Sequence, residues 1–175
     1  MTITRPGKIV CVGRNYRDHA KEMGNDVPKE PLIFLKPSSS MIATGEAIVL
    51  PSQSTQVEHE GEIGVVIGKT LRRASSAEAL KGVSKIIAAN DVTARDLQRS
   101  DSQWTRAKGF DTFCPLGEPG DPPDDLDNLT VVTRVNGVER QRGKGSDMRN
   151  RTTKGVFAAT RRATSSAGSR SHRRS

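Results

Sequence analysis

The most informative stretch of this chain, residues 57–68, contains a glycine-bounded run of β-branched residues at 65–67, which predicts a strand. Two carboxylates, Glu60 and Glu62, lie directly before that run. Since side chains two positions apart on a strand point to the same face, Glu60 and Glu62 are expected to lie side by side. Neighbouring carboxylates resist joint ionisation unless a cation neutralises them. The sequence therefore predicts a strand that holds two acidic groups on one face.

A third carboxylate, Asp91, follows a second apolar run at residues 86–89 and is expected at the end of another strand. Three carboxylates without a cluster of thiolates or imidazoles suit a hard cation. Glu60, Glu62 and Asp91 therefore predict a site for Mg²⁺ or Mn²⁺. The alternative is a solvated strand edge, to which spacing alone gives about equal weight because alternating glutamates are common.

Short apolar runs alternate with turn-rich segments over the rest of the chain up to residue 148. These runs predict strands at residues 9–12, 32–35, 47–50 and 129–135, the last ending in an Asn136-Gly137 hairpin turn. Helices are expected at residues 15–23 and 77–83, and irregular structure at 97–107 and 118–128. Many short strands with few helices indicate an α+β or mostly β roll.

Charge is divided unevenly along the chain, whose formal net charge is +8. Residues 1–140 carry 18 Lys or Arg and 19 Asp or Glu, whereas residues 141–175 carry 10 Lys or Arg and a single acidic residue, Asp147. The basic character belongs to the last 35 residues, so it is not a nucleic-acid footprint of the fold.

Composition divides the chain into a candidate catalytic domain, residues 1–148, and a basic low-complexity tail, residues 149–175. The tail is rich in Arg, Ser, Thr and Ala, with residues 156–157 as its only strongly apolar pair, and is expected to be disordered. A shifted reading frame or a truncated gene would produce this abrupt change, and a natural basic tail is the competing interpretation. No stacking aromatic residues accompany the arginines, so specific nucleic-acid binding is not expected.

The two cysteines, Cys11 and Cys114, lack the number and spacing of a disulfide framework or a zinc site. Cys11 lies in an apolar run, which predicts a buried, reduced thiol. No apolar run approaches the roughly 18 residues of a membrane span, and no signal peptide is recognised. We therefore expect a cytoplasmic protein without a membrane partner.

Six blocks of sequence, in order along the chain, resemble the fumarylacetoacetate hydrolase family, and most of all its branch of acylpyruvate hydrolases and oxaloacetate decarboxylases. These blocks lie at residues 8–16, 18–19, 34–38, 59–62, 90–96 and 108–117. The resemblance runs from about residue 8 to about residue 148. It implies the mixed β-sheet roll of the family's catalytic domain, incomplete at its C-terminal end, and a homodimer in complete relatives.

The resemblance also implies catalytic roles for three residues. His19 and Glu22 are three positions apart, so a helix places them on one face, where the carboxylate would orient the imidazole as a general base. A His and a Glu three positions apart more often form only a contact on the protein surface. The family resemblance favours a catalytic role, because relatives carry a catalytic His–Glu pair at this place. Lys108, which by itself carries almost no signal, is implied to bind the carboxylate or developing enolate of the substrate.

Weaker roles follow from the same resemblance. Arg14, Lys36 and Gln98 are implied to donate hydrogen bonds to an anionic substrate. Arg95 and Asp96 are expected either to pair with each other or to support Asp91 from behind. Glu58 is expected to be a solvated neighbour on the opposite face of its strand.

The implied activity is cleavage of a carbon–carbon bond in acylpyruvate-type 2-oxo acids. A divalent ion would polarise the keto group, and a water activated by His19 would attack the distal carbonyl. Decarboxylation of oxaloacetate or an isomerisation would use the same site, and sequence does not separate these outcomes. The alternative hypothesis is that the protein is not an enzyme. It would then be an inactive fragment that keeps the metal-ligand set, with a basic tail that attracts acidic partners such as RNA without specificity.

Overall fold

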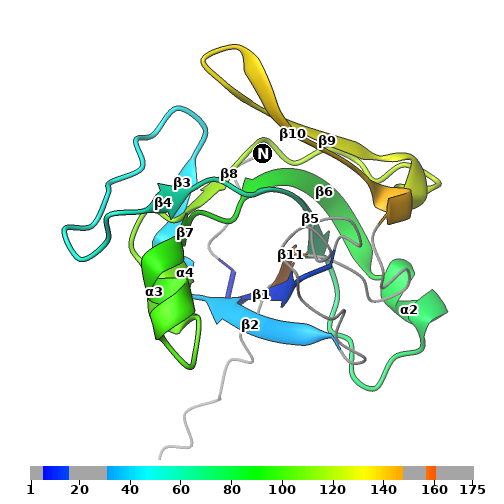
Figure 1. Cartoon of the computed structure of the whole chain (residues 1–175). Helices are drawn as coiled ribbons and strands as arrows, with labels where there is room; N and C mark the ends of the chain where they lie inside the picture. Colours follow the sequence, from blue (N-terminus) through cyan, green and yellow to red (C-terminus); the bar gives the residue numbers. More distant parts are fainter. Residues whose placement is uncertain (1–5, 16–30, 148–156, 161–175) are drawn as a thin grey trace, which may run out of the picture.

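A curved mixed sheet dominates the structure, a computed structural model that describes residues 6–15, 31–147 and 157–160. Seven strands of these described residues form it, in the order β2-β1-β11-β5-β6-β8-β3. Their bounds are β1 Lys8–Gly13, β2 Leu32–Lys36, β3 Met41–Ala43, β5 Gly61–Ile67, β6 Val83–Asn90, β8 Cys114–Leu116 and β11 Phe157–Thr160. Figure 1 shows β6 arching over β1 and β2, which confirms the expected α+β roll.

Most neighbouring strands of the sheet run antiparallel. The β11–β5 and β3–β8 pairs are parallel. The central pair, β5 and β6, places Val65 opposite Ile86 and Gly61 opposite Asn90. Since the pairing brings the start of β5 next to the end of β6, it also brings the acidic residues at those two points together.

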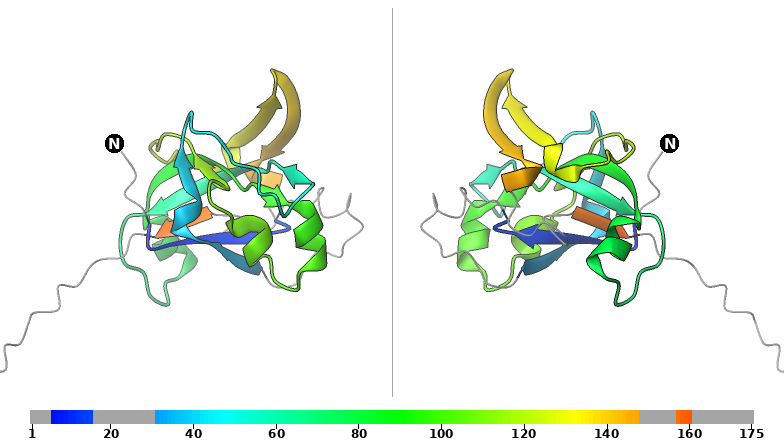
Figure 2. Two further views of the ribbon diagram at one scale, coloured as in Figure 1. Left: turned by 90° about the vertical axis from the view of Figure 1, so that its left-hand side faces the viewer. Right: turned by 90° about the vertical axis from the view of Figure 1, so that its right-hand side faces the viewer.

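Two further strand pairs and several short helices complete the described part of the chain. The strands are β4 Val57–Glu58 with β7 Thr93–Ala94, and β9 Thr130–Val135 with β10 Val138–Lys144. The α-helices are α2 Ser76–Leu80, α3 Arg95–Ser100 and α4 Thr105–Gly109, and the 3-10 helices are η1 Ser38–Ser40, η2 Leu126–Asn128 and η3 Gly145–Asp147. Figure 2 shows the β9–β10 hairpin projecting from the body.

The hairpin turn confirms the local prediction. Asn136 and Gly137 both have positive φ, 51° and 79°, as a two-residue turn between twisted strands requires. The α2 helix is also confirmed, although it ends before Val83. Its N-terminus carries a capping box between Ser75 and Glu78.

Apolar side chains form two buried clusters on either side of the acidic residues. The first contains Ile9, Cys11, Ile87, Ala89, Cys114 and Leu116 from three strands of the sheet, β1, β6 and β8. The second contains Val92, Ala94 and Phe113, against which Leu97 and Phe110 pack. The backbone at residues 90–93 crosses from one cluster to the other, so Asp91 lies between two rigid supports.

Two expectations of local structure were wrong. Residues 47–50 form no strand, since Val49 donates its backbone N–H to the Thr112 hydroxyl and Ile48, Val49 and Leu50 are exposed. Residues 97–107, expected to be irregular, lie mostly in α3 and α4 because Ala107 and Lys108 are buried. Tertiary burial decided both cases.

The structure differs from the predicted disordered tail at one point. Phe157–Thr160 forms β11 between β1 and β5, so a part of 149–175 belongs to the central sheet. Backbone hydrogen bonding to two neighbours gives this short segment its place, although its composition gave no strand signal. The other tail residues, and residues 16–23 of the expected helix, lie outside the described residues. No described helix is long and apolar enough to cross a bilayer.

Candidate functional site

Asp91 is the centre of the candidate site, directly after β6. Its carboxylate accepts a hydrogen bond from the Lys36 ammonium at 2.6 Å and another from the Lys108 ammonium at 2.7 Å. All three side chains are buried, with at most 4% exposed surface. Burial alone would raise the pKa of Asp91, but the charges of Lys36 and Lys108 outweigh it and hold the pKa below its usual value.

Lys108, from α4, connects Asp91 to a second carboxylate. Its Nζ donates to Glu60 Oε2 at 3.0 Å and to Thr93 Oγ1 at 2.9 Å, in addition to Asp91. The ammonium also lies 4.9 Å from the centroid of the Phe34 ring. Burial alone would lower the pKa of Lys108. The negative charges of Asp91 and Glu60 have the larger combined effect and hold the pKa above its usual value, so the ammonium stays charged.

Glu60 is held from two sides. Its Oε1 lies 2.5 Å from Arg95 Nη1, while its Oε2 faces Lys108. Arg95 also pairs with Glu58 at 2.8 Å and donates to Gln98 at 2.9 Å. The pairing with Arg95 lowers the pKa of Glu58. Both oxygens of Glu60 therefore have a cationic partner.

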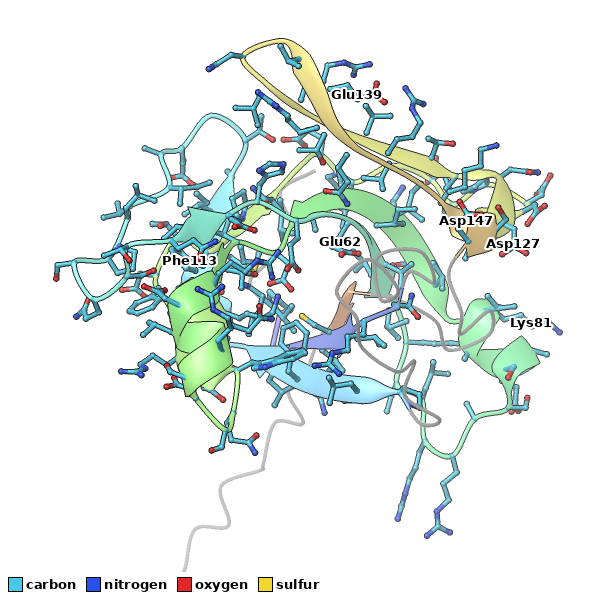
Figure 3. The ribbon with its side chains drawn as sticks, in the orientation of Figure 1. Glu62, Lys81, Phe113, Asp127, Glu139 and Asp147 are labelled. Atoms are coloured by element: carbon cyan, nitrogen blue, oxygen red, sulfur yellow. The ribbon has the colours of Figure 1, made fainter. Side chains whose placement is uncertain are left out.

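Glu62, on β5, differs from the other two carboxylates. It has no hydrogen bond or ion pair with the residues that the structure describes, and Figure 3 shows it beneath β6 on the inner side of the sheet. Burial raises the pKa of Glu62 well above its usual value, and the nearby charges of Glu60 and Asp91 raise it further. The charge of Lys108 acts in the opposite direction but does not offset these effects, so the three carboxylates share one electrostatic environment.

The donor set fits a hard divalent cation in chemistry. Oxygen ligands without thiolate or imidazole suit Mg²⁺ or Mn²⁺, and added positive charge would relieve the raised pKa of Glu62. Among the described residues, no three ligating side chains converge as around a bound ion. The Lys108 ammonium lies between Glu60 and Asp91 instead.

The backbone between the two glutamates is fixed by the hairpin. Gln141, on β10, accepts a hydrogen bond from Gly61 N–H and donates another to Gly61 C=O, both at 2.8 Å. A Cβ on Gly61 would lie 2.0 Å from Thr133 Oγ1, so only glycine permits this close approach. On the other side, Asp91 N–H donates to Glu60 C=O at 2.8 Å.

Asp96 anchors the segment that leads into the site. Its carboxylate accepts hydrogen bonds from Ser54 Oγ at 2.6 Å and from Thr55 N–H at 2.9 Å, together with Leu97 N–H at 2.9 Å. These hydrogen bonds hold the pKa of Asp96 below its usual value, and the bond from Ser54 has the largest effect. Arg95 and Asp96 therefore do not pair with each other, which corrects that alternative.

The structure brings together five of the residues singled out from the sequence: Lys36, Glu60, Glu62, Asp91 and Lys108. Gln98 contacts Arg95 rather than facing these residues directly. Arg14 is exposed, with its guanidinium 6.0 Å from the Trp104 ring centroid. His19 and Glu22 lie outside the described residues.

The sequence did not indicate three contacts around the site. Glu58 is exposed, as expected, and also pairs with Arg95. Thr93 and Gln141 carried no sequence signal, because their roles arise from contacts 15 and 80 residues away, with Lys108 and Gly61 respectively. Only the folding of β7 and the hairpin against the site reveals them.

Comparisons with known proteins show the family to which this chain is similar. The family model described as fumarylacetoacetate (FAA) hydrolase C-terminal matches residues 8–169. An uncharacterised protein of Methanocaldococcus jannaschii is 46% identical over 144 residues, which are 82% of this chain and 61% of that protein. The mitochondrial oxaloacetate tautomerase of Homo sapiens is 46% identical over 151 residues, covering 83% of this chain and 48% of the relative.

A solved structure shows the same likeness. The 5-carboxymethyl-2-hydroxymuconate delta-isomerase of Mycobacterium smegmatis superimposes with a TM-score of 0.73 at 43% identity, over 82% of this chain and 57% of that one. This chain therefore spans about half to three fifths of the length of these relatives.

Proposed function

Because this chain belongs to the fumarylacetoacetate (FAA) hydrolase C-terminal family, we propose that its site processes small 2-oxo acids through their enol or enolate form. Enol chemistry is common to a tautomerase and to a hydrolase that cleaves beside a keto group. The human relative is named as a tautomerase and the Mycobacterium smegmatis relative as an isomerase, which supports this class of reaction.

One observation carries the proposal: two fully buried ammonium groups, Lys36 and Lys108, are held against a cluster of carboxylates. A purely structural core seldom buries so many charges, since each costs several kcal/mol to desolvate. Clustered buried charges mark sites that handle charge during a reaction. We assign to Lys108 the neutralisation of a developing enolate oxygen, because its buried ammonium contacts both Glu60 and Asp91, two of the three candidate metal ligands.

Glu60, Glu62 and Asp91 are the residues that would hold Mg²⁺ or Mn²⁺. When bound, such an ion supplies a Lewis acid that polarises a keto oxygen. Arg95 keeps the carboxylate of Glu60 in place, and Lys36 does the same for Asp91. The burial of Lys36, Asp91 and Lys108 strengthens the electrostatic interactions among them.

Cleavage of acylpyruvate-type 2-oxo acids is the second candidate. It requires a base that activates water, a role that we propose for His19 with Glu22 as its orienting partner. The sequence blocks at residues 18–19 and 108–117, which contain His19 and Lys108, support it through the family resemblance. Tautomerisation would need only a proton shuttle in the same place, so the two candidates differ in whether water attacks.

The test compares Asp91→Asn with the matched exposed variant Asp121→Asn. Conversion of enol-oxaloacetate to its keto form is followed by ultraviolet absorbance with and without Mg²⁺, and pyruvate release from acylpyruvate is measured in parallel. Asp91→Asn should lower Mg²⁺-dependent turnover by about 10²-fold or more, since it removes an electrostatic contact to the reacting centre. Asp121, which pairs with Lys85 on the surface, should tolerate the change. Equal activity of the two variants would exclude the proposed site.

A further inference from the structure

The ammonium of Lys108 occupies the place between two of the three proposed metal ligands. It lies 3.0 Å from Glu60 and 2.7 Å from Asp91, with Thr93 Oγ1 as third acceptor at 2.9 Å. A lysine ammonium has three N–H donors, so all three are used here. With 2% of its surface exposed, Lys108 acts as an internal counter-cation of the acidic cluster.

We infer that Lys108 holds the acidic cluster together in the metal-free protein and leaves it when a divalent ion binds, so that the ion and the Lys108 ammonium compete for Glu60 and Asp91. This inference rests on the proposed metal site. A hard cation needs the same carboxylate oxygens. Two cations that share those oxygens would also repel each other strongly in a buried site.

The ammonium of Lys108 already lies within attractive range of two aromatic rings. The rings of Phe34 and Trp104 have their centroids 4.9 and 5.9 Å from Nζ. A flexible four-carbon stem and aromatic faces that attract cations permit a displaced ammonium to move toward these rings. Released from the carboxylates, Lys108 becomes available to an anionic substrate, which predicts that the divalent ion binds before the substrate.

Lys36 plays a different part. It contacts Asp91 Oδ1 and the carbonyl of Val92, but it does not touch Glu60. It therefore supports one ligand from behind, without filling the space between two ligands. Competition with a divalent ion is accordingly assigned to Lys108 and not to Lys36.

The first test is a calorimetric titration of the full chain with Mg²⁺ and, separately, with Mn²⁺. Lys108→Met should bind the ion about tenfold more tightly than the unchanged protein, because the competing charge is gone. Lys85→Met is the matched control, since it removes one lysine that pairs with Asp121 on the surface and should leave the affinity within about twofold. Unchanged or weaker binding by Lys108→Met would overturn the inference.

The second test needs no variant and covers the case in which Lys108→Met does not fold. Lysine acylation of the unchanged protein by an N-hydroxysuccinimide ester is mapped by mass spectrometry with and without saturating Mn²⁺. Acylation of Lys108 should rise several-fold with the ion, whereas that of Lys85 should not. An equal yield at Lys108 would overturn the exchange. Absence of any ion binding to the unchanged protein would refute the metal site itself, whereas ion binding without these effects would refute only the exchange.

Discussion

Individual charges in this protein depend on partners that are distant in sequence. Asp91 keeps a low pKa inside the protein because Lys36, 55 residues away, and Lys108, 17 residues away, both reach it. A buried ion pair contributes little net stability, but removing one partner leaves an uncompensated charge. The two lysines therefore have a structural role, in addition to the functional role that we propose for them.

Replacing Lys36 tests this dependence. Lys36→Met should lower the free energy of unfolding by about 3 kcal/mol, since Asp91 then keeps only one cation in a buried place. Lys85→Met, which breaks an ion pair with exposed Asp121, should cost at most about 1 kcal/mol. Urea unfolding followed by circular dichroism measures both, and similar losses would contradict the assigned role of Lys36.

The cysteines give a prediction for pH. Burial raises the pKa of Cys114 to about 12 from its usual 9.0. A thiol whose pKa is raised in the folded state stabilises the protein below its unfolded pKa, and this stability is lost as pH rises from about 9 to about 12. Urea unfolding at pH 8, 9 and 10 should therefore show declining stability, and Cys114→Ala should flatten the decline. If the free energy of unfolding falls equally steeply with pH in the unchanged protein and in Cys114→Ala, Cys114 is not the source of the decline.

At the scale of elements, the β9–β10 hairpin supports the site although it contributes no proposed ligand. Gln141 on β10 makes both of its backbone contacts with Gly61, the residue between the two glutamates. The hairpin thus fixes the start of β5, and with it the spacing of Glu60 and Glu62. Its closing turn was readable from Asn136-Gly137, whereas its docking was not.

Gln141→Met should remove this support. We expect a loss of about 1–3 kcal/mol in unfolding free energy, because the N–H and C=O of buried Gly61 lose their partner. Mg²⁺ affinity should fall as well, since the glutamates gain freedom. Gln53→Met is the control, because Gln53 is exposed and has only a long contact of 3.4 Å with Ser52. A variant at 141 that behaves like the one at 53 would show that the hairpin is dispensable.

At the scale of the whole molecule, β2 forms one end of the central sheet as described. Ile33 and Leu35 on this edge strand are 53% and 54% exposed, and their spacing places them on the same face. Unprotected apolar edges favour association between chains. Homodimer formation, which the family resemblance implies for complete relatives, is one form that this association could take.

Ile33→Lys should therefore reduce self-association. Light scattering coupled to size-exclusion chromatography should show a lower mean mass for this variant than for the unchanged chain at equal concentration. Leu80→Lys, at a 46% exposed position on α2, is the matched control and should leave the mass unchanged. Equal masses for all three proteins would contradict a role of the β2 edge.

The sequence by itself determined the local features of this protein. Glycine-bounded β-branched runs gave β5, the Asn136-Gly137 pair gave the hairpin turn, and the alternation of Glu60 and Glu62 indicated an acidic site. Short-range sterics and side-chain periodicity decide such features, so each is encoded within a few neighbouring residues.

Only the tertiary structure decided which charges meet. Lys108 between Glu60 and Asp91, Gln141 on Gly61, and β11 between β1 and β5 all depend on contacts between segments that are far apart in the chain. Residues 47–50 have the sequence pattern of a strand but pair with no strand in the described part of the chain. Phe157–Thr160 lacks that pattern and nevertheless pairs with β1 and β5. The physical reason is that a strand and a buried charge are stable only with their partners, and the global fold supplies those partners.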